Sequence, residues 1–234
     1  MRMTNNTWKQ GRISCAFTGH RPHKFPWKDN EADLRCVALK ETLAEQIAAL
    51  AGAGVTEYFT GGADGTDCWA AEIVLAMREK DPALKLRCIL PHEGQANRWS
   101  DSARERYHSI LKQADSVDYV SRQYYDGCMI DRNHRLVESA GLLLAVFNGV
   151  RRSGTGATVN YARKLGREII VIDPITRHIT SEGSAPPARA FSAFPRHYYT
   201  ASRSSPLHIV EVCFINEARC PPVKMRTAGF LWSG

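Results

Sequence analysis

The sequence predicts an α/β fold, namely a Rossmann-like parallel sheet with helices on both faces, plus an irregular C-terminal tail. Two observations support this class. Short β-branched or apolar runs alternate with segments of helical periodicity, which is typical of βαβ units. The run at residues 141–147 is apolar almost throughout, as expected for a central strand that is covered on both faces.

The N-terminal elements alternate in this way from the start. Residues 13–18 form the first predicted strand, and residues 31–51 form a helix whose hydrophobic side chains recur mostly at three- and four-residue steps. Residues 55–60 supply the second strand, which leads into a helix at about 65–80. The third strand follows at residues 86–91.

The same alternation continues to Pro174, which ends the last predicted strand. The remaining predicted elements are a helix at 100–114, a strand at 117–120, a helix at 127–139, the apolar strand at 141–147, a helix at 155–165 and a strand at 168–173. Residues 12–174 therefore form the predicted domain, preceded by an N-terminal extension at 1–11.

Residues 175–234 are predicted to be a basic, disordered or loosely packed tail. Up to residue 206 the tail is rich in Ser, Ala, Pro and Arg, and residues 207–215 have the pattern of one further strand. The tail holds seven basic and three acidic residues, a net +4, which leaves +3 of the total +7 for the rest of the chain. Bulk charge therefore gives the domain little support for binding DNA.

The composition indicates a globular cytoplasmic protein, with 44% hydrophobic and 24% charged residues. No apolar run approaches the roughly 18 residues of a membrane helix, and the N-terminus lacks the apolar core of a signal peptide. The seven cysteines are scattered without a CxxC pair and are predicted to be reduced. No histidine spacing is typical of a metal site, so no metal is expected.

Ligands of doubly wound sheets bind at the carboxyl ends of the strands, and three loops there carry candidate residues. The first loop, TGHRP, follows the first strand. Gly19 permits a tight turn or a close ligand approach, and Arg21 suits either a phosphate or an internal ion pair.

The second loop, TGGADGTD, follows the second strand and opens a helix. Its three glycines let backbone N–H groups converge on an anion at a helix N-terminus. These glycines are Gly61, Gly62 and Gly65. Asp64 and Asp67 repel phosphate, so they suit ribose hydroxyls, helix capping or a divalent metal better.

The third loop, RRSGTGATVNYA, follows the apolar strand and matches neither GxxxxGK[ST] nor GxGxxG, which disfavours a kinase or a classical dehydrogenase. Gly154 and Gly156 bring the backbone close to a ligand, and Arg151 and Arg152 add countercharge. The side chains predicted to reach a ligand from this loop and the preceding helix are Ser153, Thr155, Thr158, Arg132 and Asn133.

Four segments together resemble the YpsA-like family of bacterial and phage proteins: TGHRP, TGGADGTDCWAAE, RNHRLVESAGLLLAVFNG and SGTGATVNYARKLGREIIVIDP. This family is similar to the SLOG superfamily, which includes LOG-type phosphoribohydrolases and the DNA-processing protein DprA. The resemblance covers residues 13–174. It implies a Rossmann-like fold, a pocket for a nucleotide or an ADP-ribose-like molecule, and a link to stress or cell division. The residues that match the family's two ligand loops are Gly61, Gly62, Gly65 and Asp67, and Ser153, Gly154, Gly156 and Thr158.

The leading hypothesis is a nucleotide-binding or sensing protein with a small-molecule partner, no firm cofactor and no membrane. A LOG-like nucleoside-monophosphate phosphoribohydrolase is the first alternative. Asn160 stands where those enzymes carry a catalytic glutamate, so hydrolysis requires Asp64 or Asp67 as the carboxylate. A DprA-like single-stranded DNA-binding module, helped by the basic tail, is the second alternative, and a homo-oligomer is common for such folds.

Overall fold

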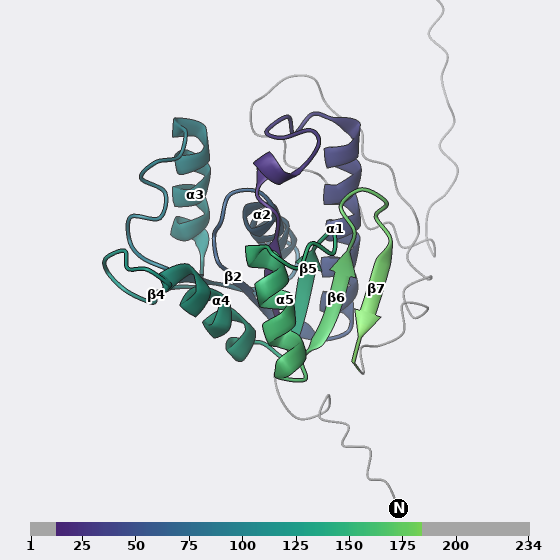
Figure 1. Ribbon diagram of the computed structural model, residues 1–234. Coiled ribbons are helices and arrows are strands. Elements are labelled where there is room, and N and C mark those ends of the chain that lie inside the picture. The colour runs from purple at the N-terminus through teal and green to yellow at the C-terminus, as the bar shows by residue number, and fades with distance from the viewer. Residues whose placement is uncertain (1–12, 184–234) are drawn as a thin grey trace, which may run out of the picture. The chain divides into compact units, whose positions relative to one another are not determined.

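The computed structural model describes residues 13–183, which form one seven-stranded sheet flanked by helices (Figure 1). The strands are β1 (Ile13–Gly19), β2 (Val55–Thr60), β3 (Lys85–Leu90), β4 (Ser116–Tyr119), β5 (Leu142–Val146), β6 (Glu168–Ile172) and β7 (Ile179–Glu182). The helices are η2 (Pro22–Lys24), α1 (Leu34–Gly52), α2 (Thr66–Arg78), α3 (Asp101–Gln113), α4 (Cys128–Ser139) and α5 (Gly154–Lys164). The predicted α/β class is confirmed. The N-terminal extension at 1–11 and the possible strand at 207–215 lie outside the described residues.

The strand order is β4-β3-β2-β1-β5-β6-β7, and every pair except β6–β7 is parallel. The chain proceeds from β1 outward to β4 and then returns to β5 on the other side of β1. The order therefore reverses between β1 and β5, and ligands of doubly wound sheets bind at the carboxyl edge of this switch point.

Two hydrophobic clusters cover the two faces of the sheet, with α1, α2 and α3 on one face and α4 and α5 on the other (Figure 1). The alternation along β5 shows the division, because Leu144 packs in the first cluster and Leu143 in the second. All five residues of β5 are buried. The prediction of a central strand covered on both faces is confirmed.

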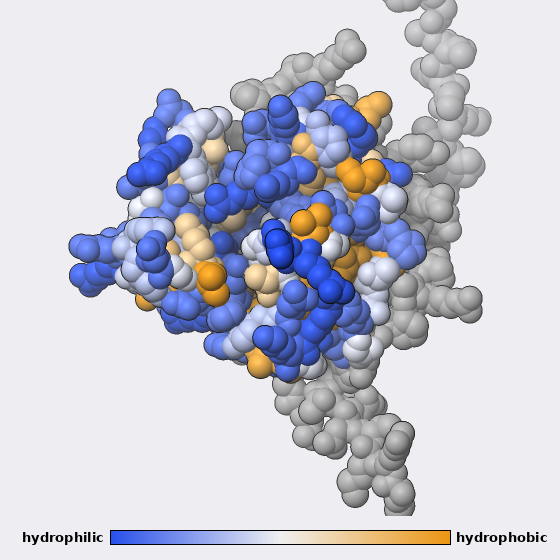
Figure 2. Space-filling view, in the orientation of Figure 1, coloured by the Kyte–Doolittle hydropathy of each residue, from blue (hydrophilic) through white to orange (hydrophobic). Residues whose placement is uncertain are grey.

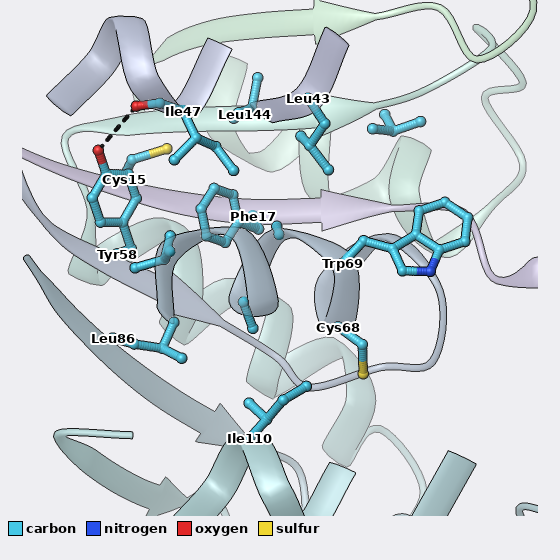
Figure 3. Close-up of a cluster of buried hydrophobic side chains, with 14 of the residues drawn as sticks. Cys15, Phe17, Leu43, Ile47, Tyr58, Cys68, Trp69, Leu86, Ile110 and Leu144 are labelled. Carbon is cyan, nitrogen blue, oxygen red and sulfur yellow. Dashed lines mark hydrogen bonds between the residues drawn. The ribbon is translucent and has the colours of Figure 1, made fainter. Parts of the chain in front are cut away.

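Aromatic side chains of β1 and of the segment after it pack in the first cluster. Phe17 of β1 stacks on Tyr58 of β2 with ring centroids 5.7 Å apart (Figure 3). Farther along, Phe25 stacks on Trp27 at 4.9 Å and on Trp69 of α2 at 5.5 Å. Stacked rings add to the hydrophobic energy of burial, so this segment is held firmly on α2.

The last strand corrects the predicted end of the domain. Residues from 175 onward were expected to form a disordered or loosely packed tail, but β7 pairs antiparallel with β6, and Arg163 of α5 forms an ion pair with Glu182 at 2.6 Å. A turn that begins at Asp173 leads into β7, with Asp173 Oδ1 accepting from the backbone N–H of Thr176 at 2.7 Å. The strand is short and mostly polar, and pairing with β6 stabilises it without a hydrophobic pattern.

Candidate functional site

The predicted ligand loops meet at the carboxyl edge of the sheet, because β1, β2 and β5 are adjacent parallel strands. His20 follows β1, the glycine-rich turn at 61–65 follows β2, and residues 147–153 lead from β5 to α5. In Figure 1, β6 points toward the end of the sheet at which α5 begins. This edge therefore collects all three loops that the sequence singled out.

His20 bridges the switch point between β1 and β5. Its Nε2 donates to Asn148 Oδ1 at 2.9 Å, and the same oxygen accepts from the backbone N–H of Val150. With the proton on Nε2, His20 Nδ1 is an acceptor. Thr155 Oγ1, in the first turn of α5, lies 3.4 Å from Nδ1 and donates to it. The residue is only 6% exposed. Burial lowers the pKa of His20, while the hydrogen bond to Asn148 opposes this shift and the nearby charges of Lys24 and His23 add to it.

The backbone carbonyl of His20 also connects the first loop to the second. It accepts from the backbone N–H of Thr66 at 3.5 Å and from Thr66 Oγ1 at 3.1 Å. His20 thus connects the first loop to the other two, whereas its neighbours Gly19 and Arg21 were the predicted ligand residues. The position of His20 next to Gly19 in TGHRP was the only available signal, because its partners are distant in the sequence.

In the turn after β2, four backbone N–H groups have acceptors within the chain. Gly62 N donates to Thr60 Oγ1, Ala63 N to Asp67 Oδ2, Gly65 N to Asp64 Oδ1, and Thr66 N to the carbonyl of His20. The sequence predicted that N–H groups of this turn converge on a bound anion. In the structure these four groups donate to the protein's own oxygen atoms.

Asp67 and Arg132 form a buried ion pair beneath this turn. Arg132 Nη1 lies 3.2 Å from Asp67 Oδ2, and the two side chains are 7% and 6% exposed. Burial raises the pKa of Asp67, because desolvation disfavours the carboxylate, while the charge of Arg132 and the Ala63 N–H oppose the shift. The structure thus brings together two residues that the sequence predicted as ligand contacts, 65 positions apart. Asn133, the next residue on α4, is partly exposed.

Gln95 and Tyr107 complete the surroundings of this turn and were not predicted as site residues. Gln95 Nε2 donates to the carbonyl of Gly62 at 2.8 Å and to that of Gly61 at 3.3 Å. Among the described residues, three buried polar atoms here have no hydrogen-bond partner. These atoms are Gln95 Oε1, Tyr107 Oη and Arg132 Nε. Neither Gln95 nor Tyr107 belongs to a sequence motif, so no sequence signal pointed to them.

Most of the predicted ligand glycines are required by packing inside the protein. A Cβ at Gly61 would lie 1.4 Å from Arg132 Nη1, and one at Gly19 would lie 2.5 Å from the side chain of Thr66. Gly62 and Gly65 have φ angles of +60° and +91°, which favour glycine. A Cβ at Gly156 would lie 2.7 Å from the carbonyl oxygen of Arg151.

Gly154 differs from these glycines because a Cβ there would meet nothing within 4 Å. It is exposed and is the first residue of α5. The three predicted hydroxyl groups nearby already have partners. Ser153 caps α5 by accepting from Gly156 N at 3.0 Å, Thr155 contacts His20, and Thr158 Oγ1 donates to the carbonyl of Gly154. The backbone of Gly154 is exposed at the start of α5, whereas Thr155 and Gly156 are buried.

The exposed charges around the switch point are mainly positive. Arg21 and Lys24 follow β1, and Arg151 and Arg152 precede α5, and all four are exposed. Arg21 lies close enough to Asp67 and Arg132 to influence the pKa of both. Figure 2 shows that the face bearing α4 and α5 is largely hydrophilic, with hydrophobic residues in small separate patches. This distribution favours an anionic ligand at the edge.

Asp64 is the more accessible acid of the second loop. It is partly exposed, and burial raises the pKa of its carboxyl, while the Gly65 N–H opposes the shift. Asn160, at the position of the hydrolase glutamate, accepts from Arg163 Nη1 at 2.9 Å within α5. Between residues 13 and 183, no group of three or more His, Cys, Asp or Glu side chains is arranged to hold a metal ion.

Within residues 13–183, no helix is both long enough and apolar enough to cross a membrane.

Comparison with known proteins gives concordant results. The YpsA family model, described as the YspA SLOG family, matches residues 15–173. A UPF0398 protein of Halalkalibacterium halodurans is 28% identical over 150 residues, covering 63% of this chain and 78% of the relative. A UPF0398 protein of Bacillus pumilus is 32% identical over 136 residues, covering 57% and 72%, and one of Bacillus thuringiensis is 29% identical over 154 residues, covering 64% and 83%. The match spans every strand from β1 to β6 except the first residues of β1, and it includes all three loops. The chain therefore belongs to the YpsA family of SLOG proteins.

Proposed function

We propose that this protein binds a nucleotide-type ligand of the ADP-ribose class and acts as a binding or sensing protein. The ligand's phosphate groups lie over the start of α5, beside the switch point between β1 and β5. Membership of the SLOG family supports a nucleotide-related function in general terms. The observation that carries the proposal is Gly154, an exposed residue at the first turn of α5 with open space where a side chain would be.

Three features support phosphate binding at this place. The first N–H groups of a helix have no partners within the helix, and the helix dipole favours an anion there. Arg151 and Arg152 precede the helix directly, and Arg21 follows β1 on the other side of the switch point. Gly154 lacks the Cβ that would hold a phosphate away from the backbone.

A thermal-shift screen of the full chain against ADP-ribose, NAD, AMP and adenosine tests the proposal. We expect the phosphate-bearing compounds to raise the melting temperature, because a ligand that binds only the folded state stabilises it by mass action. Adenosine should have a smaller effect, since it lacks the group held at α5. The absence of any shift with a folded sample would exclude the proposal.

A nucleoside-phosphate hydrolase is the second candidate, and the raised pKa of Asp64 favours it. A partly buried carboxyl with a raised pKa is suited to donate a proton to a leaving base. Chromatography of AMP and other nucleoside monophosphates incubated with the protein would reveal release of free base. Loss of that release in Asp64→Asn, with binding retained, would establish the enzyme and replace the sensor.

A further inference from the structure

The carboxylate of Asp67 occupies the place in the turn after β2 where a bound anion would be held. Its Oδ2 accepts from the Ala63 N–H at 3.3 Å and from Arg132 Nη1 at 3.2 Å. Gly62 and Gly65 of this turn have positive φ angles, and α2 begins without a side-chain cap. Backbone N–H groups, an arginine and a helix start are the parts that bind a phosphate or a carboxylate.

Arg132, the arginine of this arrangement, is buried. Arg132 is 6% exposed as a residue, its guanidinium fills the space beside Gly61, and its Nε has no partner among the described residues. A buried guanidinium without a nearby anion is strongly unfavourable. Asp67, in the first turn of α2, supplies that anion.

We infer that Asp67 is a built-in anion that fills a carboxylate-sized site formed by Arg132 and the Ala63 N–H, and that it determines specificity by excluding a ligand's anionic group from this turn. The ligand's phosphate is then directed to the start of α5. This last step rests on the proposed function, whereas the presence of the site itself does not.

Removal of the carboxylate should open the site to a small anion from solution. Alanine at position 67 keeps the Cβ, and formate has the atoms of the missing carboxylate group. The experiment compares thermal unfolding of the full chain in sodium formate and in sodium chloride at equal ionic strength. We expect Asp67→Ala to melt below the wild type in chloride and to regain a large part of the difference in formate.

Three controls separate the site from a general salt effect. Asp64→Ala changes the same turn at a residue without a contact to Arg132. The wild type and Asp64→Ala should show the same difference in melting temperature between chloride and formate. Asp67→Asn fills the site with an amide and should be destabilised without regaining stability in formate. The double variant Asp67→Ala, Arg132→Met lacks the buried cation, so it should be more stable in chloride than Asp67→Ala and should show no preference for formate.

Two results would overturn the inference. One is an Asp67→Ala variant whose response to formate equals that of Asp64→Ala. The other is an Asp67→Ala variant that stays unfolded in formate while the double variant folds, because this would show that the site does not accept an anion. Neither result depends on nucleotide binding, so failure here is distinguishable from failure of the proposed function.

The effect on specificity has its own measurement. Titration of Asp67→Ala with ADP-ribose in formate buffer should give an affinity close to that of the wild type, because the ligand's anionic group is not held at this turn. A large loss of affinity that persists in formate would contradict exclusion and would indicate that Asp67 contacts the ligand directly.

Discussion

The glycines of the candidate site differ in what lies beside them. At Gly61 the missing side chain leaves room for the guanidinium of Arg132, whereas at Gly154 it leaves open surface. Two glycines that look equivalent in the sequence therefore have different roles. The first is required by the interior of the protein, and the second is free to meet a ligand.

This difference predicts that alanine destabilises the protein at position 61 but not at position 154. Gly61→Ala would place its Cβ 1.4 Å from Arg132 Nη1, so we expect a loss of about 3 kcal/mol or more from overpacking and disturbance of the buried ion pair. Gly154→Ala should stay within about 0.5 kcal/mol of the wild type. Urea unfolding measures both. Similar losses for the two variants would contradict the distinction.

His20 predicts a pH dependence of stability. Its pKa is lowered in the folded protein by burial, so the unfolded chain binds the proton more readily just below the ordinary histidine pKa of about 6.5. Stability should therefore fall as the pH decreases from about 7 through this range. The slope has an upper limit of about 1.4 kcal/mol per pH unit for one proton.

The contribution of His20 is obtained by difference, because other groups also titrate in acid. His20→Gln should make the slope shallower in urea unfolding between about pH 7 and 5.5. His108→Gln, on the exposed side of α3, serves as the matched control and should keep the wild-type slope. An unchanged slope in His20→Gln would show that His20 is not buried as a neutral ring.

At the scale of elements, one ion network connects α3 to α2 and to the segment after β1. Arg106 of α3 donates to Glu72 of α2 at 2.6 Å and to Glu31 at 2.6 Å, and Glu31 also accepts from Trp69 Nε1 and pairs with Lys40. Burial raises the pKa of Glu31, but the hydrogen bonds and charges of Arg106 and Lys40 outweigh it and lower the pKa to about 2. The network is stronger than an isolated surface pair because one arginine serves two carboxylates.

Substitution of Arg106 should therefore loosen α3 locally. Arg106→Met keeps much of the aliphatic stem but leaves Glu31 and Glu72 without their shared partner. Hydrogen exchange should accelerate in α3 and at residues 22–33, with α5 unaffected. Arg104→Met, which removes only an exposed pair with Asp101 on α3, is the control. Equal exchange in the two variants would contradict the role of the network.

Sequence patterns predicted the elements well where burial produces them. Along β5 both faces are covered, so a continuous apolar run was a reliable signal. The strand β7 has no such pattern, because its stability comes from pairing with β6 and from the Arg163–Glu182 ion pair. Contacts of this kind join residues through the fold, and no local property of the sequence reports them.

The candidate site was predictable in its location but not in its internal arrangement. The strand-to-helix turns placed Asp67, Arg132 and Gly154 at one edge of the sheet. That Asp67 and Arg132 pair, and that His20 joins Asn148 to Thr155, depends on contacts between residues 65 to 135 positions apart. A family motif marks such residues without telling whether they contact a ligand or each other.

For the molecule as a whole, the three predicted loops lie at one edge of one sheet. The turn after β2 is filled by Asp67, His20 closes the space between β1 and β5, and the start of α5 presents exposed backbone and arginines. We therefore propose that a nucleotide is held through its phosphates at the start of α5.

Isothermal titration calorimetry with ADP-ribose tests this claim most directly. The wild type should bind, and Gly154→Leu should lose at least about tenfold in affinity, which corresponds to about 1.4 kcal/mol, while its melting temperature stays unchanged. Ala83→Leu, an exposed substitution in the connection before β3, is the matched control and should bind as the wild type does. Wild-type affinity in Gly154→Leu, or no binding of ADP-ribose by the folded wild type, would contradict phosphate binding at α5.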